Sequence, residues 1–499
     1  MSVPSPRARA RRRRLLPVVL AGALVAGASV APAQAAVVQP SLELLAPADD
    51  VVLYKYGGRE KVQLQLGLFL AAKDAPFELR AHRPDYTLPP VLTQVLHGEL
   101  GETETVELDS ALMAGWDGLA DFFDVRFTDK TGATVAEASL DFCPGGYVRE
   151  RTDDSGPAEP SYPSGCFANP FTRGVIWGID RSWAVGLDGY EAPAVKIANG
   201  TYDVSVSIDP VFVDAFSIDP GAATVQLKVK VERLRRSSCP PDCVGGGIPK
   251  PPMVHRRLAV PTIEPPDTTT MPDLVSLPAW GINVENGRKR SVVTFGATVW
   301  TAGASDLVVE GFRRENEATM DAFQYFYENG EVVGKTPVGE LEYDDRDGHF
   351  HWHFKQFAGY SLLDADMTQV LRSRKEAFCL APTDAIDLTL PHASLNPQVG
   401  LSTACGSESS IWTREILPRG WGDTYFQGLP GQSFNITDLP NGKYYIRVEA
   451  NPGGLLHEQT AANNVELREI ILKGSDGDRK VKVPLWNGSD SEKGLGFRF

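Results

Sequence analysis

Short runs in which apolar and polar residues alternate recur through the 499 residues of this chain. Successive side chains of a β-strand point to opposite faces, so such a run predicts a strand with one buried and one solvated face. Clusters of Gly, Pro, Asn and Asp separate the runs, as expected for turns between strands. The sequence therefore predicts an all-β protein built from β-sandwich-like domains. The clearest half-buried strands are predicted at 62–68, 202–208, 225–231, 291–299 and 443–449.

The chain is longer than one hydrophobic core usually serves, which predicts two domains in tandem. Residues 237–271 are rich in Pro, Gly and Thr, a composition that gives an extended linker and does not feed a core. We therefore expect an N-terminal β-sandwich at 36–236 and a C-terminal domain at 272–473. A polar tail, loosely held, is expected at 474–499.

The first 35 residues are typical of a secretory signal peptide. Six arginines precede an apolar run from Leu15 to Val30, and the small-residue pattern Ala33-Gln34-Ala35 follows. The apolar run of about 16 residues is shorter than the roughly 20 that span a bilayer. We predict cleavage before Ala36 and a secreted, extracellular protein with no transmembrane anchor after cleavage; the alternative is an uncleaved anchor.

Loss of this leader would change the formal charge from -15 to about -21, because the leader holds six arginines and no acidic residue. A protein this acidic repels polyanions, which argues against nucleic acid as a partner. The same charge attracts cations, although solubility alone explains it equally well.

The chain has six cysteines, and an even number in a secreted protein favours disulfides. Sequential pairing is the simplest of the 15 connectivities that six cysteines allow. It would join 143 to 166, 239 to 243 and 379 to 405. The close pair Cys239 and Cys243 could instead be half of a metal knuckle, but no second Cys or His pair lies nearby at zinc-finger spacing.

Three of the eight histidines stand within five residues, at His349, His351 and His353. Residues two apart on a strand share a face, so the three imidazoles are predicted on one side, with Phe350 and Trp352 on the other. Neutral imidazole binds copper, zinc, nickel and iron, and Cu(II) accepts several nitrogen ligands while leaving positions open. The sequence therefore predicts a metal site here. The other five histidines are isolated, although two in the same half could be outer ligands, His392 and His457.

From Pro272 to about Leu472 the chain resembles the catalytic domain of the lysyl oxidase family. The histidine run followed by 360–364 (Tyr-Ser-Leu-Leu-Asp) is similar to the copper segment of that family. Residues 375–380 (Lys-Glu-Ala-Phe-Cys-Leu) resemble its lysine segment, and 422–425 (Gly-Asp-Thr-Tyr) resemble its tyrosine segment.

This resemblance implies a copper-dependent amine oxidase in which Lys375 and Tyr425 form a lysine tyrosylquinone. Copper and dioxygen can oxidise a phenol to an electrophilic quinone, to which a lysine amine can add. The implied reaction is oxidative deamination of primary amines, peptidyl lysine among them, to aldehydes with release of ammonia and hydrogen peroxide. The implied partners are dioxygen and a primary amine or a lysine-containing protein.

A catalytic base must be a carboxylate or histidine within hydrogen-bond reach of the substrate. The sequence offers Asp364 and Asp423 as candidates, each of which a cap or a solvated loop would explain as well.

Two departures from the family stand out. The C-terminal half has only Cys379 and Cys405, fewer than animal members carry, and the stretch from His353 to Phe357 is one residue shorter. Two other functions remain open: an extracellular metal-binding β-sandwich protein without quinone or catalysis, and a copper protein with other oxygen chemistry. The lysine and tyrosine segments favour the amine oxidase, because passive metal binding needs neither.

The two halves also resemble each other in order and spacing. Leu140-Asp-Phe-Cys143 corresponds to Glu376-Ala-Phe-Cys379, and Asn199-Gly200 corresponds to Asn441-Gly442. The N-terminal domain is thus predicted to be either a degenerate copy without metal or quinone, or an unrelated β-sandwich. Counting along the sequence places Ala114, Trp116 and Gly118 near the positions of the three histidines. It places Ser139 near the position of Lys375 and Trp183 near that of Tyr425.

Overall fold

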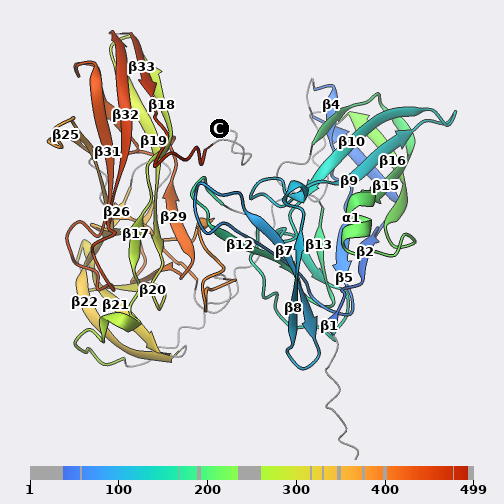
Figure 1. Ribbon diagram of the computed structural model, residues 1–499, viewed down its shortest axis with the longest axis horizontal. Helices are drawn as coiled ribbons and strands as arrows, with labels where there is room; N and C mark the ends of the chain where they lie inside the picture. The colour runs from blue at the N-terminus through green and yellow to red at the C-terminus, as the bar shows by residue number, and fades with distance from the viewer. Residues whose placement is uncertain are drawn as a thin grey trace, which may run out of the picture.

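The computed structural model confirms an all-β protein with two sandwich-like domains in tandem (Figure 1). Among the residues it describes, the only α-helix is α1 (Pro210–Ala215), and no helix is long and apolar enough to cross a membrane. The predicted signal peptide and the pair Cys239 and Cys243 lie outside those residues. The described residues are 37–56, 59–166, 168–187, 193–233, 260–314, 317–328, 331–345, 350–373, 377–396, 402–475 and 477–492.

The described part of the N-terminal domain forms three larger sheets and one small one, mostly antiparallel. The first has the order β11 (Arg149–Arg151), β13 (Trp183–Gly186), β5 (Phe69–Ala72) and β2 (Leu42–Leu45). The second has the order β1 (Val37–Val38), β7 (Val91–Gly98), β6 (Phe77–His82) and β12 (Gly174–Ile179), and β8 (Thr103–Leu108) pairs with β7. The third has the order β10 (Thr134–Phe142), β9 (Leu119–Thr128), β15 (Gly200–Ile208), β16 (Thr224–Arg233) and β3 (Asp50–Lys55). The small sheet joins β4 (Lys61–Gln63) to β14 (Ala194–Lys196).

Three sheets are formed by the residues that the structure describes in the C-terminal domain. The first has the order β17 (Leu274–Ser276), β19 (Ser291–Thr301), β29 (Trp421–Tyr425) and β27 (Asp384–Ala385), with β18 (Trp280–Asn286) and β30 (Ser433–Asn435) also on β19. The second has the order β26 (Ala377–Phe378), β23 (His351–Lys355), β22 (Glu331–Asp344), β21 (Thr319–Glu328), β20 (Leu307–Arg313) and β28 (Trp412–Leu417). The third has the order β25 (Gln369–Arg372), β24 (Ala358–Leu363), β31 (Gly442–Ala450), β32 (Val465–Ser475) and β33 (Asp478–Lys482).

Strand orders repeat between the two domains. The order β2, β5, β13, β11 has its counterpart in β17, β19, β29, β27, and β12, β6, β7, β8 in β28, β20, β21, β22. The order β10, β9, β15, β16 likewise matches β25, β24, β31, β32. Even a local detail recurs, since the hydroxyls of Tyr202 and Tyr444 each donate to the carbonyl four residues earlier, at 3.0 Å in both cases.

The pairing registers correct one of the predicted correspondences. In the N-terminal domain, Leu44 pairs with Leu70, which pairs with Val185. In the C-terminal domain, Ser276 pairs with Val299, which pairs with Asp423. Val185 therefore stands in the place of Asp423, and Leu187, two residues later, stands in the place of Tyr425 instead of Trp183.

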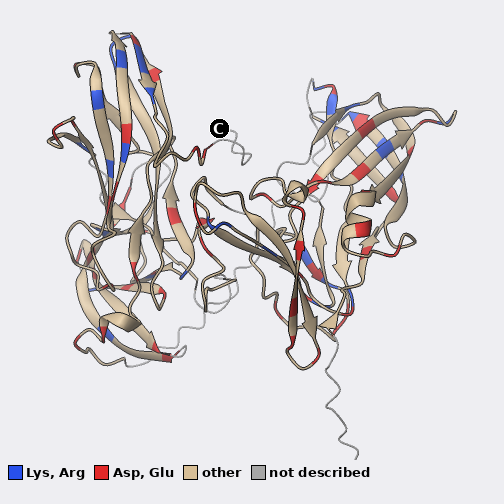
Figure 2. Ribbon diagram, in the orientation of Figure 1, with Lys and Arg blue, Asp and Glu red and all other residues tan. Residues whose placement is uncertain are grey.

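Two other predictions about the C-terminal domain need correction. Strand β19 was predicted half-buried, but all 11 of its residues are buried, because it lies inside a sheet that is covered on both faces. The predicted loose tail contains β33, which pairs with β32, so residues 478–482 of this segment belong to the sheet. Charged residues are spread over both domains, and basic ones are frequent on β31, β32 and β33 (Figure 2).

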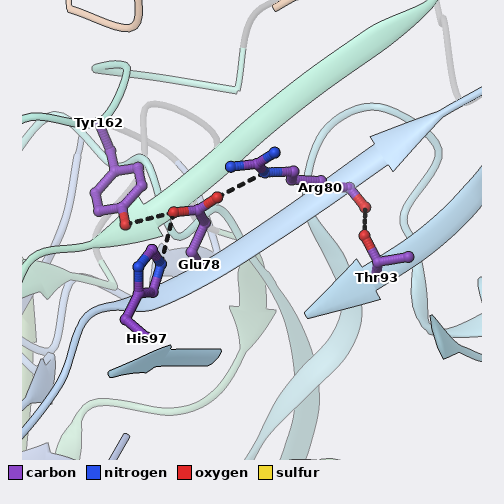
Figure 3. A network of polar contacts seen from close by, with 5 residues as sticks. All are labelled: Glu78, Arg80, Thr93, His97 and Tyr162. Atoms are coloured by element: carbon purple, nitrogen blue, oxygen red, sulfur yellow. Dashed lines mark hydrogen bonds and ion pairs between the residues drawn. The ribbon is translucent and has the colours of Figure 1, made fainter. Parts of the chain in front are cut away.

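A buried acid in the N-terminal domain has a purely structural environment (Figure 3). The carboxylate of Glu78 accepts hydrogen bonds from Arg80 Nε at 2.6 Å and from the hydroxyl of Tyr162 at 2.9 Å. His97 Nε2 lies 2.9 Å from the same carboxylate. Three partners satisfy the acid, so His97 serves as a structural residue, as its isolation in the sequence suggested.

Candidate copper and cofactor site

Two of the predicted metal-binding histidines, His351 and His353, lie on β23. The imidazoles of His351 and His353 share one side of the strand, with ring centroids 4.6 Å apart. His353 is almost fully buried, and Asp344 Oδ2 on the adjacent β22 lies 3.3 Å from its Nδ1. A carboxylate at one ring nitrogen orients the imidazole and leaves the other nitrogen for a metal. These two residues therefore fit a copper site, while the third predicted ligand, His349, lies outside the described residues.

The two aromatic residues of this segment do not share a face, contrary to the prediction. Phe350 has a left-handed backbone (φ 50°) and is 54% exposed, so the regular alternation begins only at His351. Trp352 is fully buried, packs against Tyr343 and donates from its indole nitrogen to the carbonyl of Ser407 at 2.8 Å. The buried indole thus anchors the strand between its two described histidines.

Strand β23 is called the copper strand below, because it carries the predicted ligands His351 and His353. The predicted cofactor tyrosine, Tyr425, is separated from this strand by a single strand. Its ring packs edge to face on Phe378 of β26 at 4.7 Å, and β26 pairs directly with β23 through Phe378 and Phe354. Burial raises the pKa of the Tyr425 phenol well above its ordinary value, and the charge of Asp423 raises it further, whereas a hydrogen bond from the Cys379 amide opposes them. The phenol is therefore protonated at neutral pH.

The predicted lysine, Lys375, lies outside the described residues, but its neighbours in the chain are placed. On one side the amide of Ser373 donates to the carbonyl of Tyr360 at 2.9 Å. On the other side Ala377 pairs with Lys355 at the end of the copper strand. The chain thus enters and leaves the lysine segment beside elements of the site.

A disulfide links the lysine segment to the copper strand. Cys379 is bonded to Cys405, and the carbonyl of Cys405 accepts a hydrogen bond from the amide of Trp352 at 2.9 Å. The N-terminal domain has the corresponding bond between Cys143 and Cys166. These two pairs confirm sequential pairing for four of the six cysteines.

Loss of the disulfide in the C-terminal domain should weaken both stability and the metal site. For Cys379→Ser with Cys405→Ser, we expect the free energy of unfolding to fall by about 3 kcal/mol, the value for a loop of this length. Copper affinity should also fall, because the carbonyl partner of the copper strand loses its anchor. Urea unfolding and copper titration measure the two effects.

The matched control is Cys143→Ser with Cys166→Ser, which opens a loop of similar length, 23 residues against 26. This variant should lose comparable stability and keep copper affinity within about twofold. Equal copper affinity in both double variants would contradict the proposed link.

Three carboxyl groups lie on or near β29, which carries Tyr425 and is called the tyrosine strand below. Asp423 is 3% exposed and shares a strand face with Tyr425. Glu415 on β28 is fully buried, and its Oε2 accepts a hydrogen bond from the amide of Leu380 at 3.1 Å. Burial and the charge of Asp423 raise the pKa of Glu415 well above its ordinary value. Burial raises the pKa of Asp384 to about 6, although hydrogen bonds from Thr424 and Thr383 lower it.

Of these three acids, only Asp423 was singled out from the sequence. The signal for Glu415 was available in 412–417 (Trp-Thr-Arg-Glu-Ile-Leu), because alternation places Glu415 on the same face as Leu417. Asp384 carries no such signal, since β27 has only two residues.

The other candidate base, Asp364, has a local role. Its carboxylate accepts the amides of Asp366 and Thr368, both at 2.9 Å, and so caps the turn between β24 and β25. Among the possible outer ligands, His457 packs against Phe326, and burial lowers its pKa.

The raised pKa of Asp384 predicts a dependence of stability on pH. The folded protein holds this proton more tightly than the unfolded chain, whose carboxyl keeps a pKa near 3.8. Stability of the wild type should therefore fall as pH rises from about 4 to 6, and remain lower above that. Asp384→Asn removes the ionisable group, so it should be more stable than wild type at pH 7.5, by about 1 kcal/mol, and equal to it at pH 4. Urea unfolding at both pH values tests this; a wild type that gains stability relative to the variant over this interval would refute it.

Part of the chain that holds these residues is similar to known proteins. The family model for lysyl oxidase matches residues 325–481, which include both described histidines, Tyr425 and the three acids. Protein-lysine 6-oxidase of Sus scrofa is 32% identical over 128 residues, which make up 25% of this chain and 45% of that protein. The human protein-lysine 6-oxidase is also 32% identical over 128 residues, 27% of its length.

Lysyl oxidase homolog 2 of Gallus gallus is 27% identical over 159 residues, which make up 32% of this chain and 18% of that protein. The chain thus spans less than half the length of each of these relatives. Residues 325–481 of this chain are thus similar to the lysyl oxidase family.

Proposed function

We propose that this chain is a secreted, copper-dependent amine oxidase that deaminates primary amines, including peptidyl lysine, to aldehydes, with ammonia and hydrogen peroxide as the other products. The observation that carries this proposal is the buried phenol of Tyr425, packed on a strand that pairs with the copper strand. The names of the relatives, which include protein-lysine 6-oxidase, support the same reaction.

In this proposal copper is held by His349, His351 and His353, and the cofactor is lysine tyrosylquinone made from Lys375 and Tyr425. When bound, these two groups supply the oxidation of the amine, with dioxygen as the final electron acceptor. The described residues prepare the site: Asp344 orients one imidazole, and Phe378 packs against the ring of Tyr425.

We assign proton transfer to Asp423 and not to Asp364. Asp423 is buried, and its charge raises the pKa of Tyr425, so it stands near the reacting ring. Burial and the charge of Asp423 raise the pKa of Glu415 well above its ordinary value. When two carboxyl groups interact in this way, the proton is held more tightly by one of them, which leaves the other better able to accept a proton.

Replacement of Asp423 by asparagine should therefore lower kcat by about 100-fold to 10⁴-fold while the quinone still forms. Amine-dependent peroxide release gives the rate, and titration with phenylhydrazine gives the fraction of quinone. The control is Asp364→Asn, which should keep nearly full activity. The opposite ranking of the two variants would return the role to Asp364.

One experiment separates the proposed enzyme from the alternatives. The secreted protein is loaded with copper and examined for visible absorbance, phenylhydrazine reactivity and amine-dependent peroxide. An amine oxidase gives all three. A metal-binding protein without quinone gives neither a phenylhydrazine adduct nor amine-dependent peroxide, and a copper protein with other oxygen chemistry gives no phenylhydrazine adduct.

A further inference from the structure

We propose that the N-terminal domain holds the tyrosine strand β29 in position through its segment 168–174, with Asn169 and Thr172 as positioning residues. This inference rests on the proposed function for its catalytic meaning, but its structural part can be tested separately.

The segment forms the edge of the sheet that carries Tyr425. Ala168 and Gly174 form parallel bridges with Ala385 and Asp387, respectively. The amide of Arg173 donates to the carbonyl of Ile386 at 2.6 Å, and that of Leu388 donates to the carbonyl of Gly174 at 2.9 Å. Because β27 pairs with β29 on its other side, the sheet is continuous from the N-terminal domain to the tyrosine strand.

Buried side chains reach further into this sheet. The hydroxyl of Thr172 donates to the carbonyl of Ala385 at 2.6 Å. Asn169, which is 0% exposed, donates from Nδ2 to Thr298 Oγ1 at 3.3 Å, and that hydroxyl lies 2.7 Å from the hydroxyl of Thr424. Thr424 directly precedes Tyr425, so a chain of buried hydrogen bonds joins the N-terminal domain to the residue beside the cofactor tyrosine.

The conformation of Asn169 is itself fixed. Its Oδ1 accepts the amide of Phe171 at 2.8 Å, and its backbone amide donates to Thr172 Oγ1 at 2.9 Å. The amide group therefore reaches Thr298 from a rigid turn, as a positioning residue requires.

An aromatic cluster closes the same interface. Phe171 is fully buried, and its ring lies 5.4 Å from that of Trp486, which also packs on Tyr86 at 5.3 Å. The hydroxyl of Ser489 donates to the carbonyl of Tyr86 at 2.7 Å. The C-terminal segment thus covers the place where the two domains meet, which Figure 1 shows between β12 and β29.

The N-terminal domain has the strand order of the catalytic domain but not its chemical groups. Pairing of β9 with β15 and of β24 with β31 sets Phe123 in the place of Ala358. Counting back along the sequence from Phe123 and from Ala358 puts Trp116 and Gly118 in the places of His351 and His353. We infer that this domain is a degenerate copy without a metal site, and that its contacts with the tyrosine strand are its contribution to the reaction.

The position of the tyrosine matters because its phenol must be oxidised by copper chemistry and then joined to a lysine. Reactions between fixed groups depend steeply on their geometry, and a misplacement of about 1 Å can cost on the order of 100-fold in rate. Loosening β29 should therefore slow quinone formation while copper binding, which depends on β23, remains normal.

The test uses the full-length protein with Asn169→Ala and Thr172→Val combined. The matched control is Tyr162→Phe, which removes a buried hydrogen bond to Glu78 inside the N-terminal domain (Figure 3). Copper is added to metal-free protein, copper content is measured, and the rise of the phenylhydrazine-reactive fraction is followed with time. We expect full copper loading in all three proteins, wild-type kinetics in the control, and quinone formation at least about 10-fold slower in the double variant.

Wild-type kinetics in the double variant would overturn the proposal. If the double variant does not fold, the single change Asn169→Ala answers the same question. If the wild type itself forms no quinone, the proposed function fails. Hydrogen exchange of the amides of β29 then decides the structural inference alone: exchange at least about 10-fold faster in the variant supports it, and unchanged exchange overturns it.

Discussion

Replacement of Tyr425 by phenylalanine should abolish the quinone and lower amine oxidation by at least about 10³-fold, because it removes the only oxygen of the ring that the cofactor is made from. The edge-to-face contact with Phe378 is kept, so the fold and the copper site should persist. Loss of the hydrogen bond from the Cys379 amide should cost about 1 kcal/mol of stability.

The measurements are visible absorbance, phenylhydrazine titration and amine-dependent peroxide at equal copper content. The matched control is Tyr444→Phe, whose hydroxyl donates to the carbonyl of Pro440 in the sheet of β31. The control should keep quinone and activity. A Tyr425→Phe protein that reacts with phenylhydrazine would remove the tyrosine from the cofactor.

Replacement of His353 by alanine should have an effect of similar size, at an earlier step. His353 is buried beside Asp344 and is a copper ligand in the proposed function, so its loss should lower copper affinity by more than about 100-fold. Without copper the quinone should not form, and activity should be lost with it.

Copper content after dialysis against a weak chelator measures the effect of this change. Asp344→Asn keeps all the ligands and should give an intermediate loss, about 10-fold to 100-fold in copper affinity. His97→Ala, in the N-terminal domain, should bind copper as the wild type does. Wild-type copper affinity in His353→Ala would show that the metal site lies elsewhere.

The sequence predicted those parts of the molecule that depend on local pattern. Alternation gave the all-β fold, and the spacing of the histidines placed His351 and His353 on one side of a strand, because both follow from the period of two. The same rule failed at Phe350, where one left-handed residue ends the alternation and exposes the side chain.

Features that depend on pairing between distant segments were not predicted. The place of Leu187 follows from strand register, which counting along the sequence missed by four residues. The contact of Asn169 with Thr298 joins residues 129 apart, and neither residue has a neighbour pattern that indicates it. Alternation in 412–417 puts Glu415 on the face of Leu417, but its closeness to Asp423 appears only once β28 and β29 are placed.

The most direct test of the account is a peptide map of the secreted protein after copper loading in air. The proposed function requires a covalent bond between the side chains of Lys375 and Tyr425, so proteolysis and mass spectrometry should reveal these two segments as one cross-linked peptide. That peptide should be missing from metal-free protein and from the Tyr425→Phe variant. Recovery of both segments as separate, unmodified peptides from fully copper-loaded protein would contradict the account.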